Sequence, residues 1–171
     1  MKRWFAFLPL AAVVALAVLF AGYALHHDPH VNPAALVGQK APAVALPPLQ
    51  GGARAPIRPP GQGPVLVNFF FSTCVPCIQE APALMALKAQ GVPIVGVAWK
   101  EDPAKSAAFL RTYGDPFSAV FADRDGRAGV DFGITGAPET FAVAADGKVV
   151  DKEAGALTPA RAEALAERLD R

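Results

Sequence analysis

The sequence predicts one α/β domain with a mixed β-sheet, preceded by an apolar N-terminal segment and a proline-rich stretch. From residue 65 onward, runs typical of buried strands alternate with runs of helical periodicity. Residues 139–144 and 148–151 flank Asp146-Gly147, which predicts an antiparallel hairpin at the end of the sheet. The chain has 171 residues, 53% of them hydrophobic, and is therefore long enough to bury a core.

Charge and histidine content exclude several functional classes. The 16 Lys and Arg against 15 Asp and Glu give a formal net charge of +1, without the positive excess typical of nucleic-acid binding. All three histidines lie within residues 26–30, so the rest of the chain has no imidazole for a metal site or for Ser-His or Cys-His catalysis. We therefore expect no nucleic-acid partner, no metal and no cofactor.

Residues 4–25 form an uncharged stretch of mostly Ala, Val, Leu and Phe. A helix needs about 20 such residues to cross a bilayer core, and Lys2 and Arg3 favour a cytoplasmic start. A cleaved signal peptide is the alternative, since residues 22–24 read Gly-Tyr-Ala, although typical signal cores have only about 7 to 15 apolar residues. The sequence thus predicts an uncleaved transmembrane anchor at residues 1–25, with the remaining chain exported.

Residues 26–64 predict a tether between this anchor and the domain. They contain nine prolines and five glycines in 39 residues, a density that disfavours helix and regular sheet. Within them, residues 36–42 and 45–47 could form a short edge strand, where proline is tolerated. We expect the folded domain itself to span residues 65–171.

The first half of this domain alternates between strand and helix. Residues 65–71 are β-branched and aromatic, which predicts a central strand buried on both faces. Helical spacing follows from the two cysteines to Gly91, with Pro82 inside the helix. Residues 93–99 predict a second buried strand.

Two further helices carry clear capping signals. Asp102-Pro103 predicts an N-cap and a first-turn proline for a helix that ends at Gly114. Thr158-Pro159 predicts the start of the last helix, whose apolar positions fall on one face. Together with the hairpin, these elements complete the predicted mixed sheet flanked by helices.

The two cysteines, Cys74 and Cys77, are the strongest chemical signal. They follow a buried strand and begin a helix, where free backbone N–H groups and the helix dipole favour a thiolate. We expect Cys74 to be an exposed nucleophile of low pKa, and Cys77 to resolve the mixed disulfide that Cys74 forms with a substrate. Half of a metal site and a structural thiol pair are the alternatives.

A second signal lies at residues 133–140, Gly-Ile-Thr-Gly-Ala-Pro-Glu-Thr, just before the hairpin strand. Pro138 in this segment is a candidate cis-proline of the kind found in tight turns, the alternative being an ordinary turn proline.

These features together resemble the thioredoxin superfamily and, more narrowly, the CcmG/DsbE family of cytochrome c biogenesis thiol:disulfide interchange proteins. The similarity runs from about residue 36 to the last helix. It implies a thioredoxin-like fold and a single-pass inner-membrane protein whose periplasmic domain reduces the haem-binding Cys-x-x-Cys-His disulfide of apocytochrome c. A DsbD- or CcdA-like membrane protein would supply the electrons.

The resemblance also implies roles for individual residues. Cys74 would be the attacking thiol, Cys77 the resolving thiol, and Pro138 the cis-proline beside which the substrate backbone pairs. Glu139 would tune the thiol pKa or accept a proton, the alternative being a solvated carboxylate.

Two positions depart from the family pattern. Thr73 stands where the family usually has tryptophan, which changes the surface that meets the substrate. Asn68 stands where thioredoxin itself has a buried aspartate, although asparagine is common at this place in the biogenesis proteins; if a base is needed, Glu139 or Glu101 must provide it. A general exported reductase acting on other substrates and a Cu(I) chaperone using the two sulfurs remain alternative functions.

Overall fold

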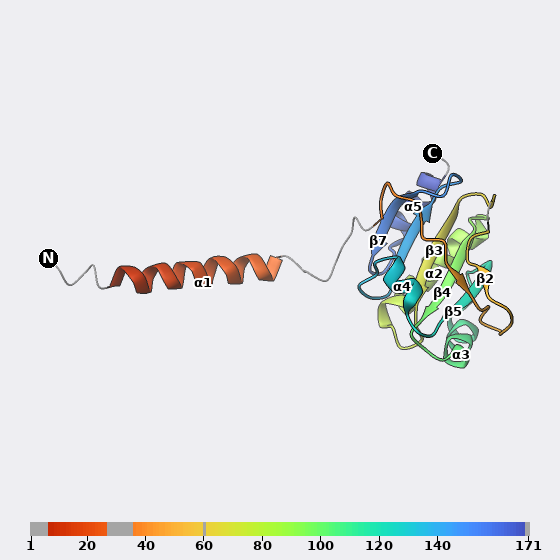
Figure 1. The fold of residues 1–171 in the computed structure, drawn as a ribbon, viewed down its shortest axis with the longest axis horizontal. Coiled ribbons are helices and arrows are strands. Elements are labelled where there is room, and N and C mark those ends of the chain that lie inside the picture. The colour runs from red at the N-terminus through yellow and green to blue at the C-terminus, as the bar shows by residue number, and fades with distance from the viewer. Residues whose placement is uncertain (1–6, 27–35, 60, 170–171) are drawn as a thin grey trace. The chain divides into compact units, whose positions relative to one another are not determined.

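The computed structural model describes residues 7–26, 36–59 and 61–169 (Figure 1). The chain divides into two units, Met1–Val31 and Asn32–Arg171. The first contains helix α1 (Leu8–His26), which is built almost entirely of apolar residues. Across the described ranges, no helix combines the length and apolar character needed to cross a bilayer. The anchor at residues 1–25 stays a prediction.

The second unit is built on a five-stranded mixed sheet in the order β5-β4-β3-β6-β7. Strands β3, β4 and β5 are parallel, whereas β6 runs antiparallel to both β3 and β7. The predicted central strand and the hairpin around Asp146-Gly147 are therefore confirmed, and the sheet is mixed as expected. The strands are β3 (Val65–Phe70), β4 (Ile94–Trp99), β5 (Ala119–Asp123), β6 (Glu139–Val143) and β7 (Val149–Ala154).

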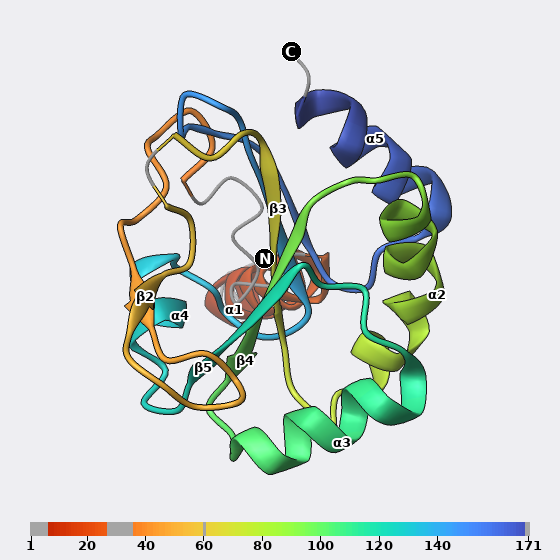
Figure 2. The same cartoon turned by 90° about the vertical axis from the view of Figure 1, so that its right-hand side faces the viewer.

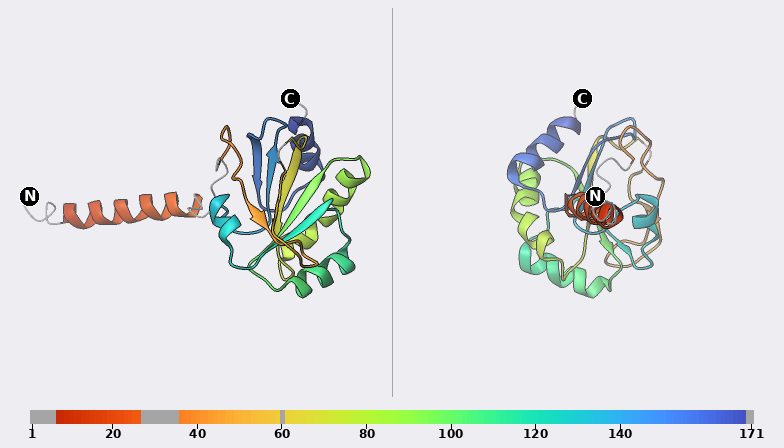
Figure 3. Two further views of the ribbon diagram at one scale, coloured as in Figure 1. Left: turned by 45° about the vertical axis from the view of Figure 1, so that its right-hand side comes forward. Right: turned by 90° about the vertical axis from the view of Figure 1, so that its left-hand side faces the viewer.

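Helices cover both faces of this sheet. Figure 2 shows α2, α3 and α5 on one face and α4 with strand β2 on the other, and the right-hand view of Figure 3 shows the same two layers. Strand β5 and helix α4 were not expected from the sequence. The helices are α2 (Val75–Ala89), α3 (Pro103–Tyr113), α4 (Arg127–Asp131) and α5 (Pro159–Leu169).

The predicted caps of α3 are present. The Asp102 side chain accepts a hydrogen bond from Ala104 N, Pro103 is the first helical residue, and Gly114 ends the helix with φ of 96°. Helix α2 begins directly after Cys74 and continues through Pro82 to Ala89. Local sequence signals thus determine where both helices begin and end.

Residues 36–59, expected to be mostly a tether, instead pack on the domain. Strand β1 (Ala45–Leu46) pairs with β2 (Ala55–Pro56) in a small separate sheet. The predicted edge strand is present only as isolated bridges to the two edge strands of the main sheet, with Val37 opposite Val149 of β7 and Pro48 opposite Phe121 of β5. Leu46, Leu49 and Ile57 are buried. The tether prediction is wrong for this segment because its spaced apolar side chains find a core to pack on, and proline-rich chain can do this without regular sheet.

Two apolar clusters fill the space on either side of the sheet, and strand β3 contributes to both. Its side chains alternate with period two, so that Leu66 and Phe70 face α2, whereas Val67 and Phe69 face α4. Asn68 shares the face of Leu66 and Phe70 by the same alternation. A polar residue is thereby placed inside the core beneath α2, fully buried.

Candidate active site

Cys74 and Cys77 form a disulfide at the N-terminus of α2, with their Cα atoms 5.2 Å apart. Strand β3 ends at Phe70, a short turn follows, and Cys74 is the N-cap of the helix. The Cys74 sulfur accepts a hydrogen bond from Cys77 N at 3.1 Å. In the reduced protein, the same N–H group and the helix dipole would stabilise a Cys74 thiolate.

Both cysteines are buried, each with 3% of its surface exposed. The expectation that Cys74 is exposed is therefore wrong. Its side chain turns back onto the helix N-terminus and toward the loop before β6, while the intervening Val75 is 62% exposed.

The loop is the segment around Pro138. The peptide bond between Ala137 and Pro138 is cis, as predicted. The carbonyl oxygen of Ala137 lies 3.4 Å from the Cys74 sulfur, where it can accept a hydrogen bond from the reduced thiol. The predicted contact of this segment with the substrate backbone stays a prediction.

Glu139 follows this proline and is buried, which contradicts the alternative of a solvated carboxylate. It shares the sheet face of Phe141 and Val143, opposite to α2. Its Oε1 accepts hydrogen bonds from Thr135 N at 2.8 Å and Thr135 Oγ1 at 3.0 Å. Its Oε2 lies 2.6 Å from Lys152 Nζ. Glu139 thus binds the loop and a lysine, and its predicted effect on the thiols stays a prediction.

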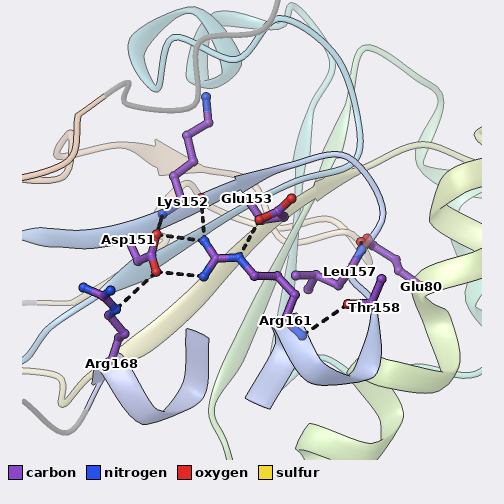
Figure 4. Close-up of polar contacts among 8 residues, drawn as sticks. All are labelled: Glu80, Asp151, Lys152, Glu153, Leu157, Thr158, Arg161 and Arg168. Atoms are coloured by element: carbon purple, nitrogen blue, oxygen red, sulfur yellow. Dashed lines mark hydrogen bonds and ion pairs between the residues drawn. The ribbon is translucent and has the colours of Figure 1, made fainter. Parts of the chain in front are cut away.

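A different carboxylate, Glu80, lies close behind Cys77. It occupies the next turn of α2 and is buried, and both residues line a small cavity of about 10 Å³. Asn68 Nδ2 donates to Glu80 Oε1 at 2.9 Å, and Leu157 N donates to Oε2 at 3.0 Å. Figure 4 shows the Glu80 carboxylate beside Leu157. Burial raises the pKa of Glu80 to about 7, although both hydrogen bonds oppose this.

Sequence reasoning missed Glu80 as a candidate base. Its spacing of three residues from Cys77 places both on the same helix face, which was the available signal. Asn68, noted only as a departure from the thioredoxin aspartate, holds this carboxylate and also donates to Thr140 Oγ1 at 2.9 Å. The buried acid behind Cys77, Glu80, therefore lies on helix α2, and the amide that binds it, Asn68, lies on strand β3.

Glu101, the other candidate base, holds the chain before Cys74. Its carboxylate accepts hydrogen bonds from Ser72 N at 2.8 Å, Ser72 Oγ at 2.6 Å and Ser106 Oγ at 2.6 Å. These contacts join the turn after β3 to the first part of α3. The geometry supports a role in positioning the turn.

A surface cavity of about 480 Å³ lies beside this turn. Thr73, directly before the reactive cysteine, lines it. A side chain larger than threonine at this position would occupy part of the space. The complete lining is Phe71, Ser72, Thr73, Trp99, Lys100, Glu101, Asp102 and Lys105.

The arrangement can perform dithiol–disulfide exchange. Cys74 lies where a thiolate is stabilised, Cys77 is bonded to it and can therefore reach it, and Glu80 has a pKa suited to proton exchange near neutral pH. Within the described ranges, no group of three or more His, Cys, Asp or Glu side chains is arranged to hold a metal.

Known proteins share this sequence and fold. The family model for redoxins matches residues 36–167. The thiol:disulfide interchange protein HelX of Rhodobacter capsulatus is 42% identical over 157 residues, which cover 89% of this chain and 87% of HelX. The thiol:disulfide interchange protein DsbE of Allochromatium vinosum is 39% identical over 166 residues, which cover 96% of this chain and 90% of that protein.

A crystal structure described as a thiol:disulfide interchange protein DsbE of Chlorobium tepidum has a TM-score of 0.64 and 29% sequence identity to this chain. The match covers 75% of this chain and 92% of that chain. The fold, the sequence and the disulfide at the helix N-terminus therefore all indicate the same family. The chain belongs to the redoxin family of thioredoxin-like proteins and is a thiol:disulfide oxidoreductase related to DsbE and HelX.

Proposed function

We propose that this protein reduces the disulfide in the haem-binding Cys-x-x-Cys-His motif of apocytochrome c during cytochrome c maturation. The observation that carries the proposal is the Cys74–Cys77 disulfide, set at a helix N-terminus beneath the loop of Pro138, in a chain similar to DsbE and HelX. The reaction uses the two sulfurs of the protein and no cofactor.

The exchange proceeds in two balanced steps. The Cys74 thiolate attacks one sulfur of the substrate disulfide, forming a mixed disulfide and releasing the other substrate sulfur as a thiolate. The Cys77 thiolate then attacks the Cys74 sulfur and releases the second substrate thiolate. Glu80 takes the proton of the Cys77 thiol in this step. Two electrons pass to the substrate, and the protein is left with the Cys74–Cys77 disulfide.

Repeated turnover requires a supply of electrons and access to exported substrates. We propose a DsbD- or CcdA-like membrane protein as the donor and a periplasmic position for the domain. The uncharged stretch at residues 4–25 supports an anchor in the inner membrane. Retention of the full chain in the membrane pellet after alkaline carbonate extraction would support the anchor, and release into the supernatant would contradict it.

The reduction potential of the cysteine pair tests the direction of the reaction. Equilibration of the protein with defined ratios of reduced and oxidised dithiothreitol, followed by thiol trapping, gives this potential. We expect a value near or below that of reducing thioredoxins, about −270 mV. A value near that of DsbA, about −120 mV, would make the protein an oxidant and contradict the proposal.

A general exported reductase acting on other substrates is the second candidate, and the cavity beside Thr73 favours it. A Thr73→Trp variant is expected to fill part of this cavity. For peptide disulfides with a bulky residue next to the target cysteine, kcat/KM should fall about tenfold, because a filled pocket rejects extra groups. Peptides with glycine at that position should react as before.

A Thr73→Val variant is the matched control. It keeps the size of threonine, so the ratio of the rates for peptides with a bulky residue and with glycine at that position should stay unchanged. If Thr73→Trp also leaves that ratio unchanged, the cavity does not contact the substrate. Comparison of a Cys-x-x-Cys-His peptide with unrelated disulfide peptides then decides between the two candidate functions.

A further inference from the structure

Strand β7 carries a lysine whose charged end is completely buried. The side chain of Lys152 is 0% exposed and that of Glu139 is 2% exposed, and their charged atoms lie 2.6 Å apart. The ammonium group also lies 5.1 Å from the centre of the Phe141 ring. Burying two charges is costly, and the cost is offset only where both are well paired.

The neighbours of Lys152 in β7 are held from the opposite side of the sheet. Arg161 of α5 donates two hydrogen bonds to Asp151, at 2.8 and 3.0 Å, and one to Glu153 at 2.5 Å. It also donates to the carbonyl oxygen of Lys152 at 3.0 Å. Figure 4 shows the guanidinium group on one side of β7 and the Lys152 side chain directed to the other. Helix α5 thus holds β7 on one face of the sheet, and the Lys152 side chain lies on the other face, where Glu139 is.

The second oxygen of Glu139 extends this contact to the reactive sulfur. Oε1 accepts hydrogen bonds from Thr135 N and Oγ1 and from Gly136 N, the last at 3.3 Å. The next residue, Ala137, places its carbonyl oxygen 3.4 Å from the Cys74 sulfur. A continuous series of contacts therefore leads from Lys152 through Glu139 and this loop to Cys74.

We infer that Lys152 is a positioning residue for disulfide exchange. By pairing with Glu139 it keeps that carboxylate buried, and the carboxylate holds residues 135–137 against Cys74. The inference rests on the proposed function and on the predicted pairing of the substrate backbone beside Pro138. Without the lysine, the buried carboxylate loses its partner and turns toward water, and it then holds the two amide groups less firmly.

A Lys152→Met variant tests this with two disulfides. For a peptide disulfide, kcat/KM is expected to fall about tenfold, because a slight displacement of a docking segment misaligns the reacting sulfurs. For hydroxyethyl disulfide, which has no peptide backbone, the rate should stay within about twofold, since it needs no docking on the loop. Hydrogen exchange at the amides of Thr135 and Gly136 should become faster. Lys152→Arg keeps the charge and should restore the peptide rate.

Lys148→Met is the matched control. It removes an exposed lysine that pairs with Asp146 at 3.2 Å in the same hairpin, so we expect an unchanged ratio of the peptide and hydroxyethyl disulfide rates. If Lys152→Met keeps the wild-type ratio and the wild-type protection of Thr135 and Gly136, the inference is wrong. If the wild-type protein reduces neither disulfide, the proposed function itself fails.

A second variant covers the case in which Lys152→Met does not fold. Thr135 is exposed, so Thr135→Val leaves the core intact and removes only the hydroxyl group that donates to Glu139. Loss of one such hydrogen bond should lower the peptide rate about threefold and leave the hydroxyethyl disulfide rate unchanged. Equal peptide rates in this variant and the wild type would contradict the positioning role.

Discussion

A Cys77→Ser variant is expected to lose all turnover and to accumulate as a covalent adduct with its substrate through Cys74. Cys74 keeps the helix N-terminus that stabilises its thiolate, so the first exchange still occurs. Serine cannot attack the mixed disulfide, and the second substrate thiolate is not released. The rate of disulfide reduction should fall by at least about 10³-fold, and mass spectrometry should detect the adduct.

The matched control is Cys74→Ser, which lacks the attacking thiol and should give neither turnover nor adduct. The two cysteines are equally buried, so exposure does not distinguish them, and the assignment rests on the position of Cys74 at the N-cap. An adduct formed by Cys74→Ser but not by Cys77→Ser would reverse the two roles.

A Glu80→Gln variant should change both the pH dependence of stability and the rate of the resolving step. Burial raises the pKa of Glu80 from the ordinary value of 4.5 to about 7, so the folded protein binds this proton more tightly than the unfolded chain. The resulting stabilisation is fully present below about pH 4.5 and is lost as the pH rises through about 7.

The size of this effect can be measured by denaturant unfolding. Between about pH 4 and about pH 8, Glu80 should contribute a decrease of about 3 kcal/mol in the free energy of unfolding. Glutamine does not titrate, so Glu80→Gln should remove this part of the decrease. Glu163→Gln makes the same exchange at an exposed position of α5 and should leave the wild-type pH dependence unchanged.

The kinetic part of the prediction concerns the proton of Cys77. Without the carboxylate, release of the substrate from the mixed disulfide should slow by about 100-fold near neutral pH. At alkaline pH the thiol ionises without help, and the rate should recover. Stopped-flow measurement of this step against pH checks the prediction. A Glu80→Gln profile identical to that of the wild type would exclude Glu80 as the proton acceptor.

Local sequence signals predicted the elements that place the reactive sulfurs. The continuous apolar run at residues 65–71 identified the central strand, and Asp102-Pro103 with Gly114 marked both ends of α3. The Cys-x-x-Cys spacing at the start of a helix predicted the disulfide pair. These features were predictable because each depends on residues within a few positions of one another, through periodicity, caps and turns.

Strand β5, helix α4 and the packing of residues 36–59 could not be predicted in this way. The proline and glycine content of residues 36–59 predicted a tether. Leu46 and Ile57 are nevertheless buried, because the sheet face opposite to α2 offers apolar partners. The burial of Cys74 likewise depends on a loop 63 residues further along the chain.

The sequence by itself thus determined the fold class, the central strand and the two reacting cysteines of this protein. Only the tertiary structure decided the surroundings of each carboxylate. Glu80 lies near Cys77 and accepts hydrogen bonds from Asn68 and Leu157. Glu139 forms a buried ion pair with Lys152. The reason is physical: the behaviour of a carboxylate depends on its desolvation and on its partners, and here those partners are far apart in the sequence.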